Sequence, residues 1–417
     1  MQETYVSIDR ERSARRIEDD VEKLGGPEHT RSSEAICRYA YTPEYRKTVE
    51  HFAEALRGLE FEVYEDPVGN LVARNRPRGE KVFGIGSHCD SNRNGGKYDG
   101  TLGVVTALEV CRLNAEHDLQ LPLQLISFLE EESSGFGVGL LGSRIAAQRM
   151  TDEELRQIKA IDDGRPFWQH AEEAGYDPGR WRESIEIFED LTGWIELHIE
   201  QARVLQDTDR RIGVVTGIAG LVWVDVTIEG RDDHAGATPM DFRLDAGVPA
   251  AQCVVELERL ARAAGNGAVG TAGAFELDPG IVNVVPGRAQ VVMDIRAPSD
   301  DVVESIAGGI EAFARNAAGE RGMAATLGRR LRMPATPMDE RIVRSLESAA
   351  ERSGEPYMLM PSGAAHDTMC VADHVPTGML FVPCKDGISH SPEEEADPAD
   401  AAVAAELLVN AIRELSG

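Results

Sequence analysis

The stretch that decides the fold is Val82-Phe83-Gly84-Ile85-Gly86-Ser87-His88-Cys89-Asp90, an apolar run that ends in a polar cluster. A second short apolar run, Leu121 to Leu129, ends in the same way at Glu130-Glu131-Glu132. Residues 102–114 between them are predicted to form a helix, so strand, helix and strand alternate. Open α/β sheets place their sites at the carboxyl ends of strands. We therefore expect both polar clusters to belong to one functional site.

The segment before these runs fits the same α/β class. Thr42-Pro43-Glu44 predicts the start of a helix, because a capping hydroxyl precedes a proline in the first turn. Residues 61–64 and 71–74 are expected to form strands on either side of the turn Asp66-Pro67-Val68-Gly69-Asn70. The first part of the chain, residues 1–212, is therefore assigned to a domain with a mixed sheet flanked by helices.

Residues 213–331 follow a different pattern and are predicted to form an inserted domain. Val222, Val224, Val226 and Ile228 alternate with polar residues or Trp223, which is typical of a half-buried strand. The predicted elements, in chain order, are a strand at 222–228, a helix at 243–264, strands at 281–285 and 289–296, a helix at 300–318 and a strand at 323–331. The order β-α-β-β-α-β indicates a ferredoxin-like α+β unit.

The chain then returns to the first domain. Residues 342–350 are predicted to be helical, and 377–383 form a predicted strand that leads into His390. Because His390 is a candidate site residue beyond the insert, the catalytic domain must be discontinuous and comprise residues 1–212 and 332–417. A length of 417 residues supports two domains, since one hydrophobic core rarely serves so long a chain.

Composition narrows the class of ligand. The formal charge of −29 disfavours nucleic acid and anionic membranes, both of which attract Lys and Arg, and favours a small-molecule substrate. The N-terminus is rich in charge and lacks the apolar core of a secretory signal, and no apolar run is long enough to span a bilayer, so we expect a cytoplasmic protein. The 6 cysteines are widely spaced, which suits reduced thiols, and Cys89 is expected to point away from any ligand bound by His88.

The polar clusters have the composition of a two-metal hydrolase site. Zinc-like ions prefer imidazole nitrogen and carboxylate oxygen, and two ions are held about 3.5–4 Å apart by a ligand that offers two oxygens. Asp99 is the predicted bridge, because glycines on both sides allow its loop to fold tightly. His88 and His198 would complete one ion, and Glu132 and His390 the other. Glu131 is then the candidate general base.

Less specific interpretations exist for each of these residues. Glu130 to Glu132 could be a solvated loop, and a single histidine is more often structural than a ligand. The position of the three glutamates after an apolar strand argues against the solvated loop. His198 is distinguished because Glu196, His198 and Glu200 share one face of a predicted strand while apolar residues take the other.

The ordered motifs GSHCDSNRNGGKYDGTLGV, FLEEES, ELHIEQ, HAGATPMDFRLDA, NVVPGR, DIR and SGAAHD...VPCKDGISHSPEE give the chain its resemblance to a known family. Over about residues 36–395 it resembles the hydantoinase/carbamoylase family of amidohydrolases, within the wider aminoacylase and carboxypeptidase G-type metallopeptidase group. That family includes N-carbamoyl-L-amino acid hydrolases, allantoate amidohydrolases and ureidoglycolate amidohydrolases.

The resemblance implies a dinuclear zinc, manganese, cobalt or nickel enzyme with an inserted lid domain that also forms a homodimer. It implies the same ligands, His88, Asp99, Glu132, His198 and His390, with Glu131 as base. The substrate-binding residues that it implies are His234, Asn283 and Arg296 from the lid, together with Gln201, Gly363, Ala364 and His366, the last acting as a support with Asp367. Arg296 would grip a substrate carboxylate, His234 would donate to the developing oxyanion, and Asn283 would orient the substrate. The alternative for Arg296 is a strand residue in an ordinary salt bridge.

Two departures from the family pattern touch the surroundings of the ligands. The usual Gly-Ser-Arg-Phe after the acidic cluster is Ser133-Ser134-Gly135-Phe136 here, and the usual Gln-Gly-Pro is Gln201-Ala202-Arg203. The metal set is unchanged, so we expect hydrolysis of the C–N bond of an N-carbamoyl or ureido group on a small carboxylate. An N-carbamoyl-L-amino acid is the first candidate, and allantoate or ureidoglycolate is the second. An aminoacylase or dipeptidase, and a non-catalytic relative that only binds a small molecule, are further alternatives.

Overall fold

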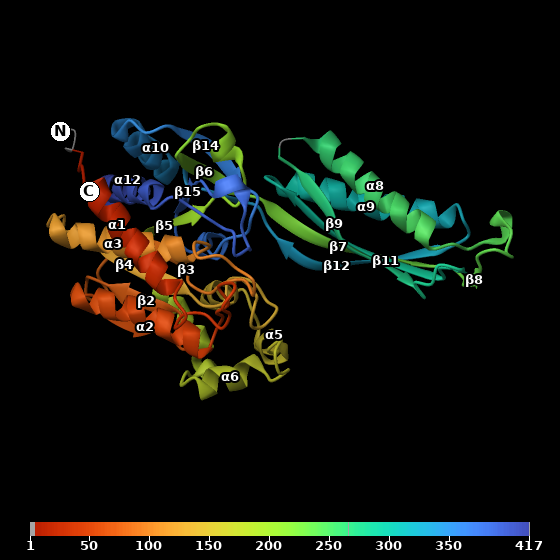
Figure 1. Cartoon of the computed structure of the whole chain (residues 1–417), viewed down its shortest axis with the longest axis horizontal. Coiled ribbons are helices and arrows are strands. Elements are labelled where there is room, and N and C mark those ends of the chain that lie inside the picture. The colour runs from red at the N-terminus through yellow and green to blue at the C-terminus, as the bar shows by residue number, and fades with distance from the viewer. Residues whose placement is uncertain (1–4, 266, 417) are drawn as a thin grey trace. The chain divides into compact units, whose positions relative to one another are not determined.

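The computed structural model describes residues 5–265 and 267–416, which form two compact units (Figure 1). Unit 1 takes in the chain up to Thr216, Met338–Met360 and the residues from His366 onward. Unit 2 comprises Gly217–Pro337 and Pro361–Ala365. The domain assignment from sequence, with the insert at 213–331, stays a prediction about functional domains, whereas these bounds describe compactness.

The larger sheet, most of which belongs to unit 1, has the strand order β1-β2-β4-β3-β5-β15-β6-β13, with β14 paired to β6. Its strands are β1 (Glu62–Glu65), β2 (Leu71–Arg74), β3 (Val82–His88), β4 (Leu123–Phe128), β5 (Leu191–Ile199), β6 (Ile212–Ile218), β13 (Thr336–Pro337), β14 (Tyr357–Ser362) and β15 (Thr377–Val382). The short strand β13 and the last residues of β6 and β14 belong to unit 2. The pairs β3–β4, β3–β5 and β5–β15 are parallel, whereas β1–β2, β2–β4, β6–β13 and β6–β15 are antiparallel. The sheet is therefore mixed, as the sequence predicts.

Strand β3 explains why its apolar run is decisive. All seven of its residues are buried, because parallel neighbours and helices cover both of its faces. Since β3, β4 and β5 run in the same direction, their carboxyl ends lie at one edge of the sheet. His88, the Glu130–Glu132 cluster and His198 are carried at or just beyond those ends. The tertiary fold thus brings together segments that are more than 100 residues apart.

Three helices of unit 1 match predicted segments, namely α2 (Pro43–Gly58), α3 (Thr101–Glu116) and α10 (Glu340–Ser353). The sequence analysis did not predict the other described helices, which are α1 (Arg10–Leu24), α4 (Leu141–Ala146), α5 (Asp152–Gln157), α6 (Phe167–Glu173), α7 (Val204–Asp207), α11 (Thr368–Val371) and α12 (Pro398–Ser416), with the 3-10 segments η1 (Pro178–Phe188) and η3 (Lys385–Gly387). The Thr42 hydroxyl accepts a hydrogen bond from the backbone N–H of Tyr45, which confirms the predicted cap of α2. Helix α12 packs against α1, α3 and α10 (Figure 1).

Unit 2 is a four-stranded antiparallel sheet with helices on one face. Its elements are β7 (Gly220–Glu229), β8 (Asp233–His234), η2 (Met240–Phe242), α8 (Gly247–Ala264), β9 (Val269–Asp278), β10 (Val284–Val285), β11 (Arg288–Ala297), α9 (Asp300–Gly319) and β12 (Ala324–Met333). The spatial order β12-β7-β11-β9 is that of a ferredoxin-like unit, in which the first and third strands are central. Alternate residues of β7 and β11 pack with α8 and α9 in a separate hydrophobic core.

One predicted strand of unit 2 is wrong. The sequence analysis places the second strand at 281–285, but the partner of β11 is β9 at Val269–Asp278. Only Val284–Val285 of the predicted segment is extended, and it pairs with β8. The error has a physical cause, because β9 is an edge strand rich in Gly and Ala and lacks the apolar alternation that marks a strand with a buried face. The helix predicted from 243 begins at Gly247, after the 3-10 turn η2.

Two further predictions concern chemistry and environment. The 6 cysteines are free thiols, and Cys89 is fully buried in the hydrophobic core of unit 1, as expected for a side chain that points away from the site. Among the described helices, none combines the length and the apolar character that crossing a membrane requires.

Candidate metal centre

His88 enters the centre from the end of β3. Its Nδ1 lies 3.4 Å from Asp90 Oδ1, which leaves Nε2 to face Asp99 Oδ1 at 3.9 Å and Glu131 Oε2 at 3.8 Å. Gly100 makes this possible, because it has a positive φ of 60° and a Cβ at this position would overlap the His88 ring. The glycines around Asp99 therefore permit a close approach of the loop to the histidine.

Asp99 is the residue that joins the cluster. Its Oδ1 lies 3.1 Å from His198 Nε2, and its Oδ2 lies 3.2 Å from His390 Nε2. His390 Nε2 is also 3.4 Å from Glu132 Oε2. Possible ligand atoms within 4.8 Å of one another therefore form two groups that share Asp99, namely His88 with Asp99 and His198, and Asp99 with Glu132 and His390. The structure brings the five predicted ligands together in the pairing expected from the sequence.

The electrostatics of the cluster fit a cation. Burial raises the pKa of Glu131 and of Glu132 well above the ordinary value, and nearby carboxylates add to the shift. Burial would also raise the pKa of Asp99, but hydrogen bonds from His198 and His390 hold it well below its usual range. Glu132 Oε1 is buried without a hydrogen-bond partner among the described residues. Crowded carboxylates with an unsatisfied buried oxygen are the donor set that a divalent ion satisfies.

Glu196, His198 and His366 form a third group of possible ligands. In this group, Glu196 and His366 lie around the candidate ligand His198. Glu196 accepts hydrogen bonds from the Ser87 hydroxyl at 2.8 Å and from the Thr368 hydroxyl at 2.6 Å, so its carboxylate is occupied. The His366 ring packs edge-on against His198 with 4.5 Å between ring centroids. His366 thus lies behind a candidate ligand, in the supporting position that the sequence analysis expects.

Two carboxylates that position the site were not assigned a role from the sequence. Asp90 accepts hydrogen bonds from the backbone N–H groups of Glu131 and Glu132, at 3.1 and 3.0 Å. Glu394 accepts from the backbone N–H groups of Tyr98 and Asp99, at 2.8 and 2.9 Å, and burial raises its pKa to about 6. A signal was present in both motifs, since Asp90 follows His88 by two residues and Glu394 follows His390 by four.

Gln201 lies beside the bridging carboxylate. Its Nε2 donates to Asp99 Oδ2 at 2.9 Å and lies 3.5 Å from His390 Nε2. Its backbone has a positive φ of 58°, which is uncommon for a non-glycine residue. The residue predicted to line the substrate pocket therefore contacts the candidate metal ligands directly.

His234 and Asn283 lie next to each other in unit 2. His234 belongs to β8 and Asn283 directly precedes its partner strand β10, and the Ala235 N–H donates to the Asn283 carbonyl at 3.0 Å. His234 Nδ1 accepts hydrogen bonds from the backbone N–H groups of Gly236 and Ala237, at 3.0 and 3.1 Å. In the neutral ring the proton is then on Nε2, which makes His234 an exposed hydrogen-bond donor.

Two roles were considered for Arg296 from the sequence, namely an ordinary salt bridge and a place in the substrate pocket, and its contacts bear on both. Its Nε and Nη2 donate to Asp294 Oδ1 and Oδ2, each at 2.9 Å, so the salt bridge exists. Its Nη1 donates to the Gly363 carbonyl at 3.0 Å, which brings one predicted pocket residue to the guanidinium. Neighbouring Ala364 is held in a local turn, where its N–H donates to the Ser362 hydroxyl at 3.2 Å.

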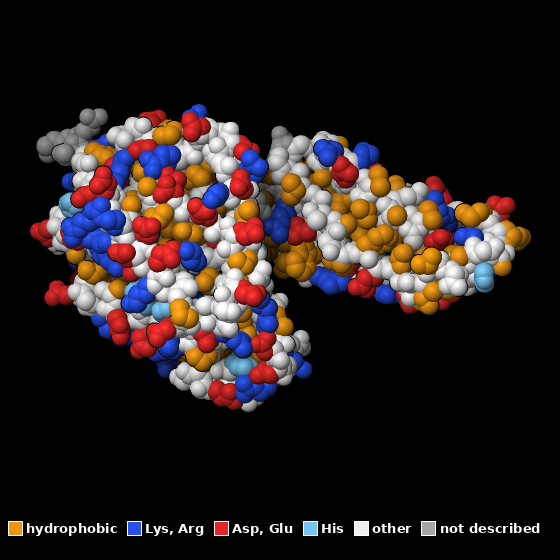
Figure 2. All heavy atoms as spheres, in the orientation of Figure 1, with side chains coloured by type: hydrophobic (Ala, Val, Ile, Leu, Met, Phe, Trp, Pro, Cys, Tyr) orange, Lys and Arg blue, Asp and Glu red, His pale blue; other side chains and the backbone are white. Residues whose placement is uncertain are grey.

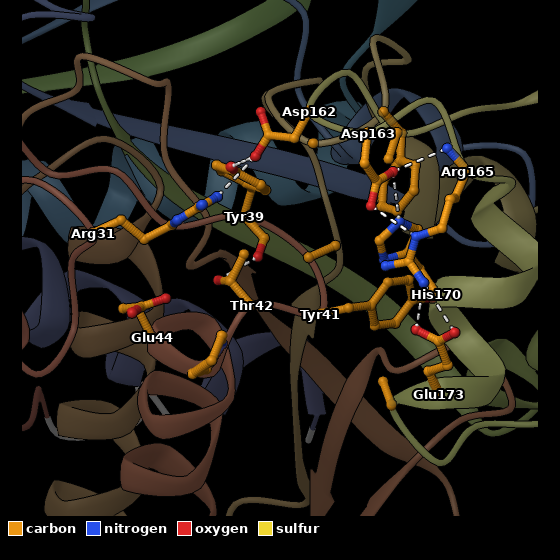
Figure 3. Close-up of a pocket in the computed structure, with 16 residues that line it drawn as sticks. Arg31, Tyr39, Tyr41, Thr42, Glu44, Asp162, Asp163, Arg165, His170 and Glu173 are labelled. Atoms are coloured by element: carbon orange, nitrogen blue, oxygen red, sulfur yellow. Dashed lines mark hydrogen bonds and ion pairs between the residues drawn. The ribbon is translucent and has the colours of Figure 1, made fainter.

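A different hollow in unit 1, about 580 Å³ in volume, is lined by charged and aromatic side chains (Figure 3). Several of its charges are paired within the hollow, since Arg31 forms an ion pair with Asp162 at 2.9 Å and Arg165 forms ion pairs with Asp163 and Glu173, each at 2.8 Å. Glu44 Oε2 is buried without a hydrogen-bond partner among the described residues. None of the predicted site residues is among the described residues that line it. It is therefore separate from the candidate metal centre.

Comparison with known proteins gives a consistent result over nearly the whole chain. Residues 84–414 match peptidase family M20/M25/M40. The chain is 37% identical over 389 residues to an N-carbamoyl-L-amino acid amidohydrolase of Geobacillus stearothermophilus, covering 92% of this chain and 94% of that protein. It is 31% identical to an allantoate amidohydrolase of Bacillus subtilis, covering 86% and 87% of the two chains. A solved amidase of the hydantoinase/carbamoylase family from Burkholderia multivorans matches with a TM-score of 0.86 and 29% identity over 98% of each chain.

Proposed function

The chain belongs to peptidase family M20/M25/M40, and from that membership we propose that it is a metal-dependent N-carbamoyl-L-amino acid amidohydrolase. The products would be the free amino acid, ammonia and carbon dioxide. The observation that carries the substrate class is the 37% identity to an N-carbamoyl-L-amino acid amidohydrolase across 92% of this chain. The cluster centred on Asp99 supports hydrolysis as the reaction.

Two divalent ions, of zinc, manganese, cobalt or nickel, are part of the proposal. His88, Asp99 and His198 would hold one ion, and Asp99, Glu132 and His390 the other. Ions held by such ligands make water more acidic and polarise a carbonyl group. The alternation of histidine and carboxylate around one shared aspartate is what supports this assignment.

Glu131 is proposed as the general base and then the general acid. Asp90 fixes the backbone of Glu131, and burial raises the pKa of its carboxyl group well above the ordinary value. A carboxylate with a raised pKa can take a proton from the attacking water and then give it to the leaving nitrogen at neutral pH. One residue thus serves both halves of the reaction.

Arg296, His234 and Asn283 are proposed to bind the substrate from unit 2. The Arg296 guanidinium would bind the substrate carboxylate, and the Nε2–H of His234 would donate to the oxyanion that develops on the carbamoyl carbon. Gln201, Gly363, Ala364 and His366 complete the proposed binding set.

We also propose that unit 2 acts as a lid, with hinges near 212–213 and 332–334. The same unit is proposed to form the surface of a homodimer, and the enzyme is proposed to be cytoplasmic. Small-angle scattering with and without an inhibitor tests closure, because compaction is expected.

Glu131→Gln in the metal-loaded protein tests the role of the base. Turnover of N-carbamoyl-L-amino acids is expected to fall by more than about a thousandfold, because no other group then takes the proton, while metal content measured by mass spectrometry stays the same. Glu172→Gln, which changes an exposed carboxylate of α6, is the matched control and should behave as wild type. Retained activity in Glu131→Gln would remove Glu131 from this role.

Allantoate amidohydrolase is the second candidate, and the 31% identity to the Bacillus subtilis allantoate enzyme over 86% of this chain favours it. A substrate panel separates the two. N-carbamoyl amino acids, allantoate, ureidoglycolate and N-acetyl amino acids are supplied with Mn, Co or Zn, and ammonia and free amine are measured. Ammonia release from N-carbamoyl amino acids above all others is the expected result.

A further inference from the structure

A hollow on the sheet of unit 2 adjoins Arg296 and is not used by the catalytic groups described above. It has a volume of about 640 Å³ and is lined in part by Trp223, Val269, Ala274 and Val292. Gly363, whose carbonyl accepts from Arg296, lies at the same hollow. Hydrophobic side chains reach the surface over this unit (Figure 2). Arg296 and Arg330 also line the hollow, so apolar walls are combined with two arginines.

The strand register places these side chains on the face of the sheet that α8 and α9 leave open. Asp294 pairs with Trp223, Arg296 with Val269, and Val292 with Ala274. The alternate residues of β11, which are Val291, Met293 and Ile295, are buried in the core on the other face. Because neighbours along a strand point to opposite faces, Val292, Asp294 and Arg296 share the open face.

Arg296 has hydrogen-bonding capacity directed at a ligand. A guanidinium has five N–H donors. Among the described residues three of these meet acceptors, two on Asp294 and one on the Gly363 carbonyl. The two others belong to the two terminal nitrogens, one on each, and can donate to a carboxylate. Asp294 therefore holds the arginine while two of its N–H donors take part in none of these hydrogen bonds.

Two of the polar side chains around the hollow are paired. Trp223 Nε1 donates to Asp294 Oδ2 at 2.9 Å, so the polar atom of the indole is satisfied while 38% of the residue stays exposed. Arg330, which also lines the hollow, is tied to Asp225, since its Nε donates to Asp225 Oδ2 at 2.6 Å. Beside these groups and the Thr271 hydroxyl, the walls are aromatic and aliphatic carbon, which favours an apolar ligand group.

We propose that this hollow is the subsite for the substrate side chain, and that the preferred substrates carry a branched aliphatic or aromatic side chain beside their carboxylate. The inference rests on the proposed function, in which Arg296 binds the carboxylate. In an N-carbamoyl amino acid the carboxylate and the side chain share the α-carbon, so a side-chain subsite has to adjoin the carboxylate site. A hydroxyl or second ureido group at that carbon, as in ureidoglycolate or allantoate, would lose water against mainly apolar walls and fill less of the hollow.

The test compares N-carbamoyl-L-phenylalanine and N-carbamoyl-L-leucine with N-carbamoylglycine, which lacks a side chain. The metal-loaded full chain is assayed for kcat/KM, and the Glu131→Gln variant is used to measure Kd by calorimetry without turnover. We expect both measures to favour the bulky substrates over N-carbamoylglycine by about tenfold or more. Trp223→Ala should reduce that preference about tenfold, because it removes the largest apolar wall.

Two variants make the test specific. Trp223→Phe keeps an aromatic wall and loses only the N–H bond to Asp294, so it should retain the preference within about threefold. Phe275→Ala changes an exposed aromatic residue of strand β9 that pairs with Val291 and faces the other side of the sheet. It should leave the preference unchanged.

The outcomes separate the subsite from the reaction. A preference close to one, or a preference that survives Trp223→Ala, overturns the subsite even when N-carbamoylglycine is hydrolysed. In another outcome, calorimetry shows a preference that Trp223→Ala abolishes while the wild type hydrolyses neither substrate. That result upholds the subsite and rejects the proposed function. If Trp223→Ala changes the sedimentation of the protein and leaves the preference intact, the face binds a second copy of the chain and the proposal is wrong.

Discussion

Three candidate ligands of unit 1 differ from the candidate substrate-binding residues of unit 2 in burial, whereas the ligand His390 has a side chain that is 49% exposed. His88, Asp99 and His198 are 1%, 4% and 2% exposed. In unit 2, His234 and Asn283 are exposed, and the Arg296 side chain is 31% exposed. Buried donors that cannot reorganise suit an ion that stays bound, whereas exposed side chains can bind and release a substrate in every cycle. The difference indicates a division of labour between the units.

Backbone conformation follows the same division. Glu130, Ser133, Gln201 and His390 in unit 1 have positive φ angles between 54° and 59°. Among the described residues of unit 2, positive φ is confined to glycines. Conformations of this kind cost free energy and persist where the surrounding structure enforces them. The candidate metal centre therefore contains backbone conformations that its surroundings have to enforce, and the following predictions test how far its contrast with unit 2 extends.

The largest effect is expected from Asp99→Asn, which removes the shared ligand. Metal content measured by mass spectrometry should fall below two ions per chain, and activity should fall by more than about a thousandfold, because several kcal/mol of stabilisation depend on the ions. Asp207→Asn, at an exposed position of α7, is the control and should keep both properties. Two retained ions in Asp99→Asn would show that the buried cluster does not bind metal through this residue.

Arg296→Lys tests the proposed substrate-binding role of the exposed residues of unit 2. Lysine keeps the charge but cannot form two parallel hydrogen bonds to a carboxylate, so KM should rise about 10- to 100-fold with a smaller change in kcat. Arg288→Lys, on the same strand β11, is the matched control. Steady-state kinetics with an N-carbamoyl-L-amino acid decide the point. An unchanged KM would mean that Arg296 serves only its salt bridge with Asp294.

Glu406→Gln tests whether burial also governs ionic stabilisation away from the site. Glu406 accepts hydrogen bonds from Tyr5 and Arg10, each at 2.8 Å. Burial would raise the pKa of Glu406, but the bonds from Arg10 and Tyr5 hold it below the ordinary value. Since the folded pKa is below the unfolded pKa, the stabilisation is present above about pH 4.5 and is lost as the pH falls through the folded pKa.

We therefore expect Glu406→Gln to lower the free energy of unfolding by about 2 kcal/mol at pH 7, with a smaller difference from wild type below about pH 4.5. Urea denaturation across this pH range measures both. Glu414→Gln, at an exposed position of the same helix α12, should be neutral. A difference that grows as the pH falls would contradict the sign of the pKa shift.

The smallest effect is expected from an exposed pair of unit 2. Arg262 and Glu258 of α8 form an ion pair at 2.8 Å, with side chains 79% and 64% exposed. Arg262→Gln should change the free energy of unfolding by less than about 0.5 kcal/mol, and the difference should disappear in about 1 M salt. Thermal denaturation at two salt concentrations checks this. An effect as large as that of Glu406→Gln would break the correlation between burial and ionic stabilisation.

Several parts of the fold could be predicted because local patterns coincide with the tertiary environment. Strand β3 is a continuous apolar run because both of its faces are buried. The N-cap of α2 could be predicted from Thr42 followed by Pro43. Strand β9 could not be found in this way, since its pairing with β11 depends on backbone hydrogen bonds and its side chains carry little apolar pattern.

The sequence by itself determined the chemistry of this protein, because histidine, carboxylate and glycine at motif spacing state which atoms can bind a cation and where the chain can bend tightly. Only the tertiary structure decided how those atoms are held. The carboxylates of Asp90 and Glu394 grip the backbone of the candidate ligands, and Asp294 orients Arg296 beside an apolar hollow. Such contacts join residues that are distant along the chain or lie on one face of a sheet. Composition and periodicity do not record them, because they depend on which surfaces meet when the chain folds.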